Sequence, residues 1–483
     1  MDSDPSADGG PPSTPSERNT DTTAVSGPLG ATNDTESLPL PPYPSDLGPP
    51  TLHVARQMRD VLEFSRRAHE SGDVVRTRLL GQGEEFHLAH PEFLKRVLVS
   101  ERDAFGKSAD FDLTFGEGLL TVEGEQWRRQ RGALQPLFAR ESVMGYAEGI
   151  TEQVRRRTDR WSDGDRFDLQ CELTGMTLDV LFATVLGREL ALDGDERLRA
   201  AAENLHEWFV PTSLFLPPWV PTPARRRFEA AKVTLREEAD RLLAERRADP
   251  PTDPADAEDL LSLLVGLQEV GADESAMLTD DRLRDQMITI LFAGHDTTTT
   301  LLTFAFWALA NDPEIKARFQ EEVDRLDGRP TDEDVGGLPV TDRLVTETLR
   351  LYPPVYVLPR RTTRSVVLGG YRIPADERVI AEIRRIQRDP RFFDAPEEFR
   401  PSRWQGDLRS ELHDFAYAPF GGGPRVCIGR EFALLEAKLA LATIGREYDL
   451  YWLGENQADG EPPLSPAMTL RMEQGQEFLV TER

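Results

Sequence analysis

Residues 420–429 read Phe-Gly-Gly-Gly-Pro-Arg-Val-Cys-Ile-Gly, and the rest of the chain is interpreted from this stretch. Its three glycines and one proline predict a loop, and the apolar periodicity that begins at Glu431 predicts a helix directly after it. Cys427 therefore lies at a helix N-terminus. Backbone N–H groups, the helix dipole and the nearby Arg425 and Arg430 would stabilise a thiolate there. The glycines also let a bulky group approach the backbone.

A thiolate in this setting either attacks a substrate or binds a metal. A nucleophile needs a base nearby, and the seven histidines are scattered without a cysteine-protease or oxidoreductase signature. A haem iron needs one thiolate and flat apolar space, so it fits the loop better. The second cysteine, Cys171, lies in an apolar-periodic segment and is predicted to be a small buried residue.

The segment from Asp281 to Ala310 predicts a long helix that is buried on nearly all faces. Its centre, from His295 to Thr300, is nevertheless polar. Polar groups in a core are unfavourable unless they bond locally or serve a reaction. A threonine there could simply bond to a carbonyl of its own helix, and this structural alternative stays open.

These segments together resemble the cytochrome P-450 family. Its cysteine-ligand loop has a pattern that is filled here by Phe420, Gly421, Gly423, Arg425, Cys427 and Gly429. The resemblance implies haem b as cofactor and Cys427 as the axial iron ligand. It also implies that Phe420 packs near the sulfur and that the amides after Cys427, including Gly429, hydrogen-bond it. Such bonds withdraw charge and tune the potential of the iron.

The sequence Ala293-Gly294-His295-Asp296-Thr297-Thr298 resembles the oxygen-activation motif of the same family. This is the polar centre of the predicted long helix. The resemblance implies that Asp296 and Thr297 are catalytic residues that relay protons during oxygen activation.

Glu347-Thr348-Leu349-Arg350 resembles the E-x-x-R motif of the family. The spacing places both side chains on one helix face, but Glu63 and Arg66 have the same spacing, so spacing alone carries no information. With Arg403, in the segment FRPSRW, the resemblance implies a buried triad. We expect this triad to support the cysteine loop rather than to take part in catalysis.

Trp127 and Arg131 resemble the W-x-x-x-R helix of the family. The resemblance implies that they bind the haem propionates together with Arg425 and with either Arg360 or Arg361. Arginine pairs with carboxylates through two hydrogen bonds. We favour Arg360, although the two adjacent arginines could instead be a solvated pair.

The resemblance covers residues 45–483 and implies one large, mainly α domain with a small β region. Strand-like segments are Asp73–Leu79, Phe86–Leu88 and Val366–Ile373. Residues 1–44 are rich in Asp, Ser, Thr and Pro, and a segment with so little apolar surface to bury is predicted to be disordered.

The composition bounds the location and the partners of the protein. The formal net charge is -28, and only five of the 57 basic residues are Lys. An acidic, Lys-poor surface stays hydrated in salt and favours a halophilic archaeon as source. The same charge argues against nucleic acid as partner. Because no secretory signal and no apolar stretch of about 20 residues is present, we expect a soluble cytoplasmic protein.

The predicted function is a monooxygenase that inserts one oxygen atom from dioxygen into a lipophilic substrate. Only 56 residues follow Cys427, too few for a fused reductase, so we expect a separate ferredoxin-type electron donor with its own reductase. A peroxygenase or isomerase that uses peroxides is an alternative, although those branches tend to lose the acid–threonine pair. A non-enzymatic haem-binding sensor is a further alternative.

The substrate class is predicted from residues 208–221, WFVPTSLFLPPWVP. Prolines keep this apolar segment from forming one regular helix. The resemblance implies a lip of the substrate channel, which would also give peripheral contact with a membrane. Packing on the domain core is the alternative. The branch that looks most similar contains fatty-acid and bacterial carotenoid hydroxylases.

Overall fold

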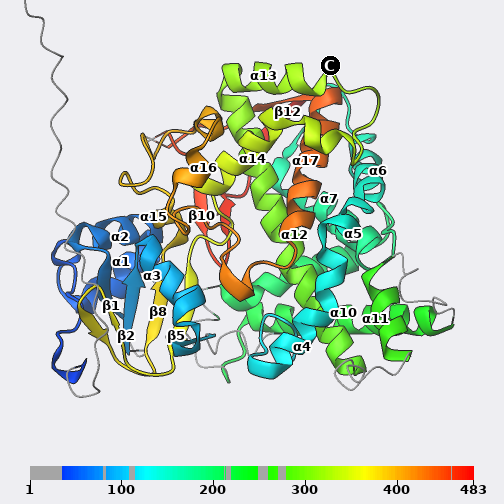
Figure 1. Cartoon of the computed structure of the whole chain (residues 1–483). Helices are drawn as coiled ribbons and strands as arrows, with labels where there is room; N and C mark the ends of the chain where they lie inside the picture. The colour runs from blue at the N-terminus through cyan, green and yellow to red at the C-terminus, as the bar shows by residue number, and fades with distance from the viewer. Residues whose placement is uncertain are drawn as a thin grey trace, which may run out of the picture.

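A computed structural model describes residues 35–79, 83–107, 115–210, 213, 219–248, 259–269, 279–457 and 460–483. Helices form most of it and surround one long central helix, α12 (Asp280–Asn311), as Figure 1 shows. The predicted fold class, mainly α with a small β region, is confirmed. The other α-helices are α1 (His53–Arg59), α2 (Val61–Ala68), α3 (Pro91–Lys95), α4 (Gly124–Leu134), α5 (Arg140–Met144), α6 (Ala147–Thr158), α7 (Leu169–Thr184), α8 (Glu196–Asn204), α10 (Pro223–Ala248), α11 (Leu260–Glu269), α13 (Pro313–Val323), α14 (Pro339–Leu351), α15 (Ile383–Ile386), α16 (Leu408–Glu411) and α17 (Arg430–Glu447).

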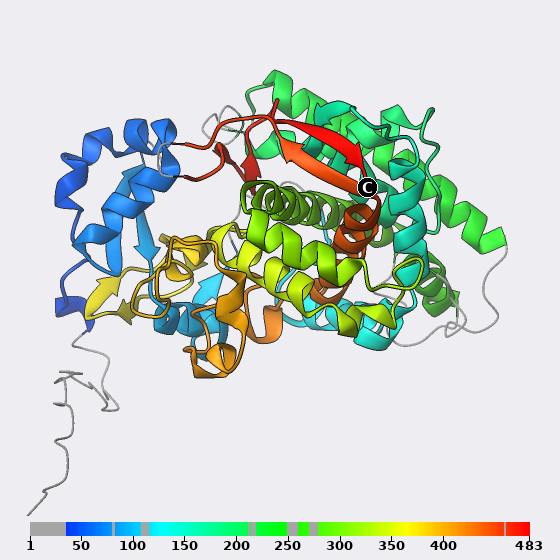
Figure 2. The ribbon, with the colours of Figure 1, turned by 90° about the horizontal axis from the view of Figure 1, so that it is seen from above.

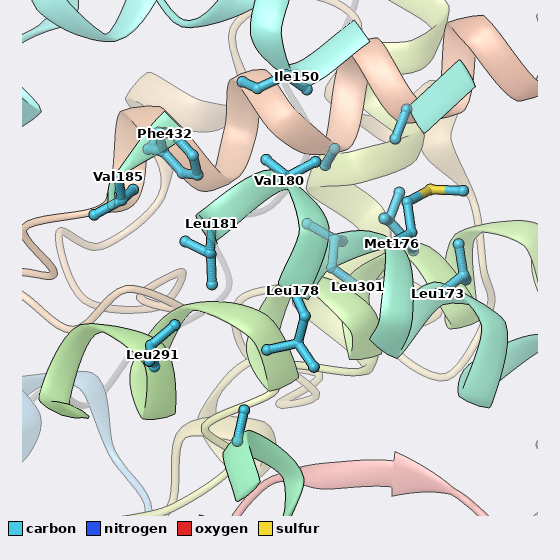
Figure 3. Packing of buried hydrophobic residues seen from close by; sticks show 14 of the residues in the cluster. Ile150, Leu173, Met176, Leu178, Val180, Leu181, Val185, Leu291, Leu301 and Phe432 are labelled. Atoms are coloured by element: carbon cyan, nitrogen blue, oxygen red, sulfur yellow. The ribbon is translucent and has the colours of Figure 1, made fainter. Parts of the chain in front are cut away.

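Helix α12 is buried along most of its length because α7, α14 and α17 pack around it. Apolar side chains of α7, such as Leu178 and Leu181, lie between α12 and α17 (Figure 3). Gly294 permits this close packing, since a Cβ at that position would lie 2.8 Å from Leu181 Cδ1. The long helix predicted from Asp281 to Ala310 is confirmed to within one residue at each end.

The strands of the described residues form four small sheets. The largest has the order β1-β2-β8-β5-β3, with β2 and β8 parallel and the other pairs antiparallel. It lies beside α1 and α2 at one side of the molecule (Figure 1), whereas β9 and β12 run along another face (Figure 2). The strands are β1 (Val74–Leu79), β2 (Gly83–Leu88), β3 (Phe105–Gly106), β4 (Arg166–Asp168), β5 (Leu358–Thr362), β6 (Val366–Leu368), β7 (Tyr371–Ile373), β8 (Arg378–Ala381), β9 (Tyr448–Trp452), β10 (Leu464–Pro466), β11 (Leu470–Met472) and β12 (Glu477–Glu482).

The N-terminal lead-in contacts the folded body before residue 45. The N–H of Arg372 donates to the carbonyl of Pro39 at 2.9 Å, and the N–H of Arg76 donates to that of Pro42 at 3.1 Å. The Pro-rich segment is therefore held along β7 and β1. Residues 1–34, most of the segment predicted to be disordered, lie outside the described residues.

Two further predictions meet the structure here. Cys171 is exposed, so the prediction of a buried residue is wrong. It lies in the first turn of α7, where its N–H donates to Asp168 Oδ1 at 3.1 Å and one side of the helix is left uncovered. In the segment 208–221, Trp208 and Phe209 are buried and Trp219 is 82% exposed. Leu214, Phe215 and Leu216 lie outside the described residues. None of the described helices is long and apolar enough to cross a membrane.

Candidate active site

The loop that carries Cys427 is closed by its own backbone. The N–H of Cys427 donates to the carbonyl of Phe420 at 3.0 Å, so Phe420 lies next to the cysteine. Between them, Gly423 has a φ of 66° in the left-handed region. A Cβ on Gly423 would also lie 2.7 Å from the carbonyl oxygen of Leu98, so only glycine fits there. Helix α17 begins at Arg430, which confirms the predicted order of loop and helix.

The side chain of Cys427 is exposed, yet enough protein surrounds it that burial raises the pKa of the thiol. The N–H of Gly429 and the charges of Arg131 and Arg430 oppose this effect and favour the thiolate. Arg131 is held in place because its Nη1 donates to the carbonyl of Val426 at 2.8 Å.

The centre of α12 is accessible on one face. Ala293 is exposed and Gly294 and Thr297 are partly exposed, although their neighbours Phe292 and His295 are buried. Ala293 and Thr297 are four residues apart and therefore share one helix face. Thr297 Oγ1 donates to the carbonyl of Ala293 at 2.9 Å. This bond is the one expected from the structural alternative, and it leaves the hydroxyl at the edge of the accessible face.

Three arginines predicted to bind the cofactor come from three different elements. Arg131 is on α4, Arg360 on β5 and Arg425 on the cysteine loop. The guanidinium of Arg425 lies 5.8 Å from the ring centroid of Trp127, and its Nη1 lies 3.3 Å from Glu123 Oε1.

Arg360 and Arg361 differ in their surroundings. Burial lowers the pKa of Arg360 to about 10, and the charge of Arg425 acts in the same direction while Glu123 opposes it. Two cations therefore share one carboxylate, so an added anionic group fits this place. Arg361 instead is half exposed and pairs with Asp376 at 2.6 Å.

The predicted triad forms as a buried cluster. Arg350 Nε and Nη2 donate to Glu347 at 2.9 and 2.8 Å, and Arg403 Nε donates to the same carboxylate at 2.8 Å. Trp404 Nε1 is a further donor at 2.7 Å, which sequence reasoning missed. Burial raises the pKa of Glu347, but the bond and charge of Arg350 and the charge of Arg403 outweigh it, so the pKa is lowered.

Asp296 lies in an ionic cluster that the sequence did not reveal. Arg471 of β11 pairs with one carboxylate oxygen, and Thr469 Oγ1 donates to the other. His206 Nδ1 lies 3.9 Å from the carboxylate. Burial raises the pKa of Asp296, but the charge of Arg471 and the bond from Thr469 oppose it, and the pKa of the carboxyl group is lowered. His206 itself is neutral, because burial lowers its pKa to about 3.

Aromatic rings pack around Phe292, on the same part of α12 as Asp296. The ring centroids of Phe115 and Phe292 are 4.4 Å apart, and those of Phe209 and Phe292 are 5.5 Å apart. His206 stacks on Phe292 at 4.7 Å. This cluster of rings is therefore apolar apart from the neutral imidazole of His206.

Comparison with known proteins now decides the family. The family model described as Cytochrome P450 matches residues 41–476. The chain belongs to the cytochrome P450 family. Pentalenene oxygenase of Streptomyces avermitilis is 34% identical over 404 residues, which are 81% of this chain and 87% of that protein. Cyclooctat-9-en-7-ol 5-monooxygenase of Streptomyces melanosporofaciens is 32% identical, over 82% of this chain and 87% of that protein.

A solved structure agrees with this assignment. The retinoic acid-bound cyanobacterial CYP120A1 has a TM-score of 0.80 and 25% sequence identity, and the match covers 92% of this chain and all of that one (100%). Cytochromes P450 bind haem b through a cysteine thiolate, and this chain is a P450 monooxygenase. The donor set fits the cofactor, because the thiol of Cys427 is accessible and two cations share one carboxylate. The relatives named here do not support the predicted halophilic archaeal source.

Proposed function

We propose that Cys427 is the axial ligand of the haem iron and that the enzyme inserts one oxygen atom from dioxygen into a lipophilic substrate. The observation that carries this proposal is that two surfaces of neighbouring elements are accessible. One bears Cys427, and the other is the face of α12 that bears Ala293 and Thr297. Helix α17, which follows the cysteine loop, packs against α12. The haem supplies the redox chemistry that activates oxygen.

The protein residues around this region would bind and orient the cofactor. Arg360, Arg425 and Arg131, with Trp127, would hold the propionates, because guanidinium groups match carboxylates with paired hydrogen bonds. Phe420 would pack near the sulfur, and the N–H of Gly429 would withdraw charge from it. The triad of Glu347, Arg350 and Arg403 would keep the cysteine loop rigid. We assign these residues to structure and to cofactor binding.

Thr297 and Asp296 would move protons at the accessible face of α12. The hydroxyl of Thr297 lies on that face, and Asp296 is the next residue on the helix. The partner of Asp296, Arg471, is 30% exposed at its side chain, so the pair links the buried carboxylate to solvent. Asp296 would accept a proton from solvent beside Arg471 and release it toward Thr297, in the manner of general acid–base catalysis, while Arg471 keeps its own protons.

We further propose that the substrate is a terpenoid or another long apolar molecule. The two Streptomyces relatives are named for oxygenation of pentalenene and of cyclooctat-9-en-7-ol, and the aromatic cluster of Phe115, Phe209 and Phe292 suits an apolar molecule of this kind. Trp219, which is largely exposed, would act as part of the entrance and touch a membrane that holds the substrate.

Electrons would come from a ferredoxin-type protein with its reductase, and the protein would work in the cytoplasm. Arg128 and Arg129 extend from α4 with side chains 62% and 50% exposed. Both pair with Glu125, so the expected basic surface is partly neutralised. We propose that an acidic donor would compete with Glu125 for these arginines.

The test uses both cysteines of the chain. Reduced protein with carbon monoxide should show the red-shifted Soret band of a thiolate ligand, and Cys427→Ala should abolish it. Cys171→Ala is the matched control, since that exposed thiol lies in the first turn of α7. Retention of the band in Cys427→Ala would refute the ligation. A panel of terpenes, carotenoids, retinoids and fatty acids, followed by haem absorbance shifts and product analysis, tests the substrate class.

A further inference from the structure

The loop that precedes α4 rests directly on the N-terminal half of α12. This loop, residues 115–123, begins with the sequence FGEG. Gly116 has a φ of 56°, in the left-handed region, and a Cβ at that position would lie 2.1 Å from Asp285 Oδ2. A Cβ on Gly118 would lie 2.0 Å from Thr289 Oγ1. The two glycines therefore bring the loop backbone onto α12, where a larger residue would push it away.

Asp285 of α12 holds this loop and α10 at the same time. Its Oδ2 accepts a hydrogen bond from the N–H of Glu117 at 2.9 Å. Its Oδ1 accepts another from Nη2 of Arg236, on α10, at 3.0 Å. The side chain of Asp285 is only 10% exposed, so water cannot readily replace either partner. One carboxylate therefore joins three elements: the loop, α12 and α10.

The neighbouring residue of α12 bonds the same loop on its other side. Gln286 Oε1 accepts a bond from the N–H of Leu119 at 3.2 Å, and Gln286 Nε2 donates to Gln130 Oε1 at 2.7 Å. Gln130, on α4, donates in turn to the carbonyl of Glu117 at 2.8 Å. Both glutamines are buried. Side-chain bonds thus fix the loop to α12 and α4, and Asp285 extends this set of bonds to α10.

The loop carries Phe115 into the aromatic cluster. Phe115 is 1% exposed, and its ring centroid lies 4.4 Å from that of Phe292 and 6.3 Å from that of Phe209. Asp285, Thr289 and Phe292 share one face of α12, because they are spaced by four and three residues. The residue after Phe115 is the glycine that rests on Asp285. A shift of the loop on Asp285 would therefore move Phe115.

We propose that Asp285 is a positioning residue for substrate selectivity: it joins α10 to the 115–123 loop and thereby fixes where Phe115 lies. This inference rests on the proposed function, in which the aromatic cluster meets the substrate. A loop that is held in advance gives a bulky ligand an ordered surface, whereas a loosened loop has to be ordered during binding, which weakens the binding. Arg236 acts through Asp285, because its loss would leave a nearly buried carboxylate without that cation.

Hydrogen exchange of the holoenzyme measures the order of the loop directly. In Asp285→Ala the amides of residues 115–123 should exchange about tenfold faster or more, because a hydrogen bond to a charged group is lost. Arg236→Ala should change the exchange in the same direction, although the bond of Arg236 is to Asp285 and not to the loop. Asp240→Ala is the matched control. It removes the ion pair between Asp240 of α10 and Arg284 of α12, which joins the same two helices.

Ligand binding, followed by haem absorbance shifts, measures the effect on selectivity. Imidazole needs only the iron, whereas the chain of 1-dodecylimidazole also meets the apolar surroundings. Asp285→Ala and Arg236→Ala should weaken binding of 1-dodecylimidazole about fivefold or more and leave the Kd of imidazole within about twofold. Asp240→Ala should change neither value. Arg236 is 46% exposed at its side chain, so its removal should leave the fold intact.

Three results would overturn the proposal: unchanged exchange of the loop in Asp285→Ala, equal weakening of both ligands, or the same change in Asp240→Ala as in Arg236→Ala. Failure of the proposed function would appear instead in the wild type. There it would show as the absence of a haem absorbance shift with imidazole, or as no gain in affinity from the dodecyl chain.

Discussion

Two pairs of the form Glu-x-x-Arg share the same local geometry and differ only in their surroundings. On α2, Arg66 donates to Glu63 through Nε at 2.6 Å and Nη2 at 2.8 Å. On α14, Arg350 donates to Glu347 through the same two atoms at 2.9 and 2.8 Å. The side chains of the first pair are 51% and 36% exposed, and those of the second are 0% exposed. Each carboxylate also accepts a bond from a second arginine, Arg67 or Arg403.

The difference shows that hydrogen-bond geometry alone does not determine how much an ion pair contributes to the stability of the fold. Water can replace the partner of an exposed charge, so a surface pair contributes little. In the core no water is available, and every donor and acceptor must be satisfied by protein. Arg350 meets this demand by donating also to the carbonyls of Gln387, Pro396 and Glu398.

The largest expected effect follows from breaking the buried pair. Arg350→Ala should lower the free energy of unfolding by about 3–5 kcal/mol, because Glu347 would stay charged in the core and three carbonyls would lose their donor. Chemical denaturation of the holoenzyme, with the haem spectrum as second probe, measures the loss. Arg350→Lys is the control: it keeps the charge but cannot make the paired bonds, so its effect should be intermediate. A loss below about 1 kcal/mol in Arg350→Ala would mean that the triad does not support the fold.

A buried glutamate without an arginine should behave in the opposite way, and Glu436 is this case. Its folded-state pKa, about 8, is above the ordinary value of 4.5, so the folded state holds a proton that the unfolded state releases. Stability should therefore fall as pH rises from about 4.5 to about 8. Glu436→Gln should remove this slope and raise the free energy of unfolding at neutral pH by about 1 kcal/mol or more. Glu347 has a lowered pKa, so its stabilising effect is lost as pH falls below 4.5.

The check on this prediction is denaturation of wild type and Glu436→Gln at a series of pH values. Thr443→Val provides a control, since Thr443 lies on the same helix and its buried hydroxyl also has no partner among the described residues. The two proteins should converge in stability at acid pH and separate as pH rises. Parallel curves would show that Glu436 is already ionised in the folded state.

Sequence reasoning found the parts of the site that depend on local patterns. The cysteine loop, the long helix and the E-x-x-R motif each contain several specified residues within a short stretch, and each element lies where it was expected. The partners of Asp296 could not be found in this way. Arg471 and Thr469 come from a hairpin far along the chain, and only folding brings them to α12.

Glu436 illustrates a signal that was present but not used. The stretch EFALLEAKLALA was interpreted only as a helix after the loop, without a prediction of which of its residues are buried. The helix is in fact covered on most sides, with α6, α12 and α14 packed against it. Its apolar residues are too many for one face, and a helix that is apolar nearly all round is buried. Cys171 shows the converse error, since apolar periodicity does not extend burial to the first turn of a helix.

The smallest expected effect concerns the exposed pair, and it completes the comparison. Arg66→Ala should lower the free energy of unfolding by about 0.5 kcal/mol or less. The bonds from Arg66 and Arg67 outweigh burial and hold the pKa of Glu63 at about 2, but this group is over a third exposed, so water and salt screen the interaction. Arg67 would also remain to pair with Glu63. Denaturation at low and high salt measures the effect, and the difference between wild type and Arg66→Ala should vanish at high salt. A salt-independent loss as large as that of Arg350→Ala would mean that the paired hydrogen-bond geometry, and not the exclusion of water, determines how much an E-x-x-R pair contributes to stability.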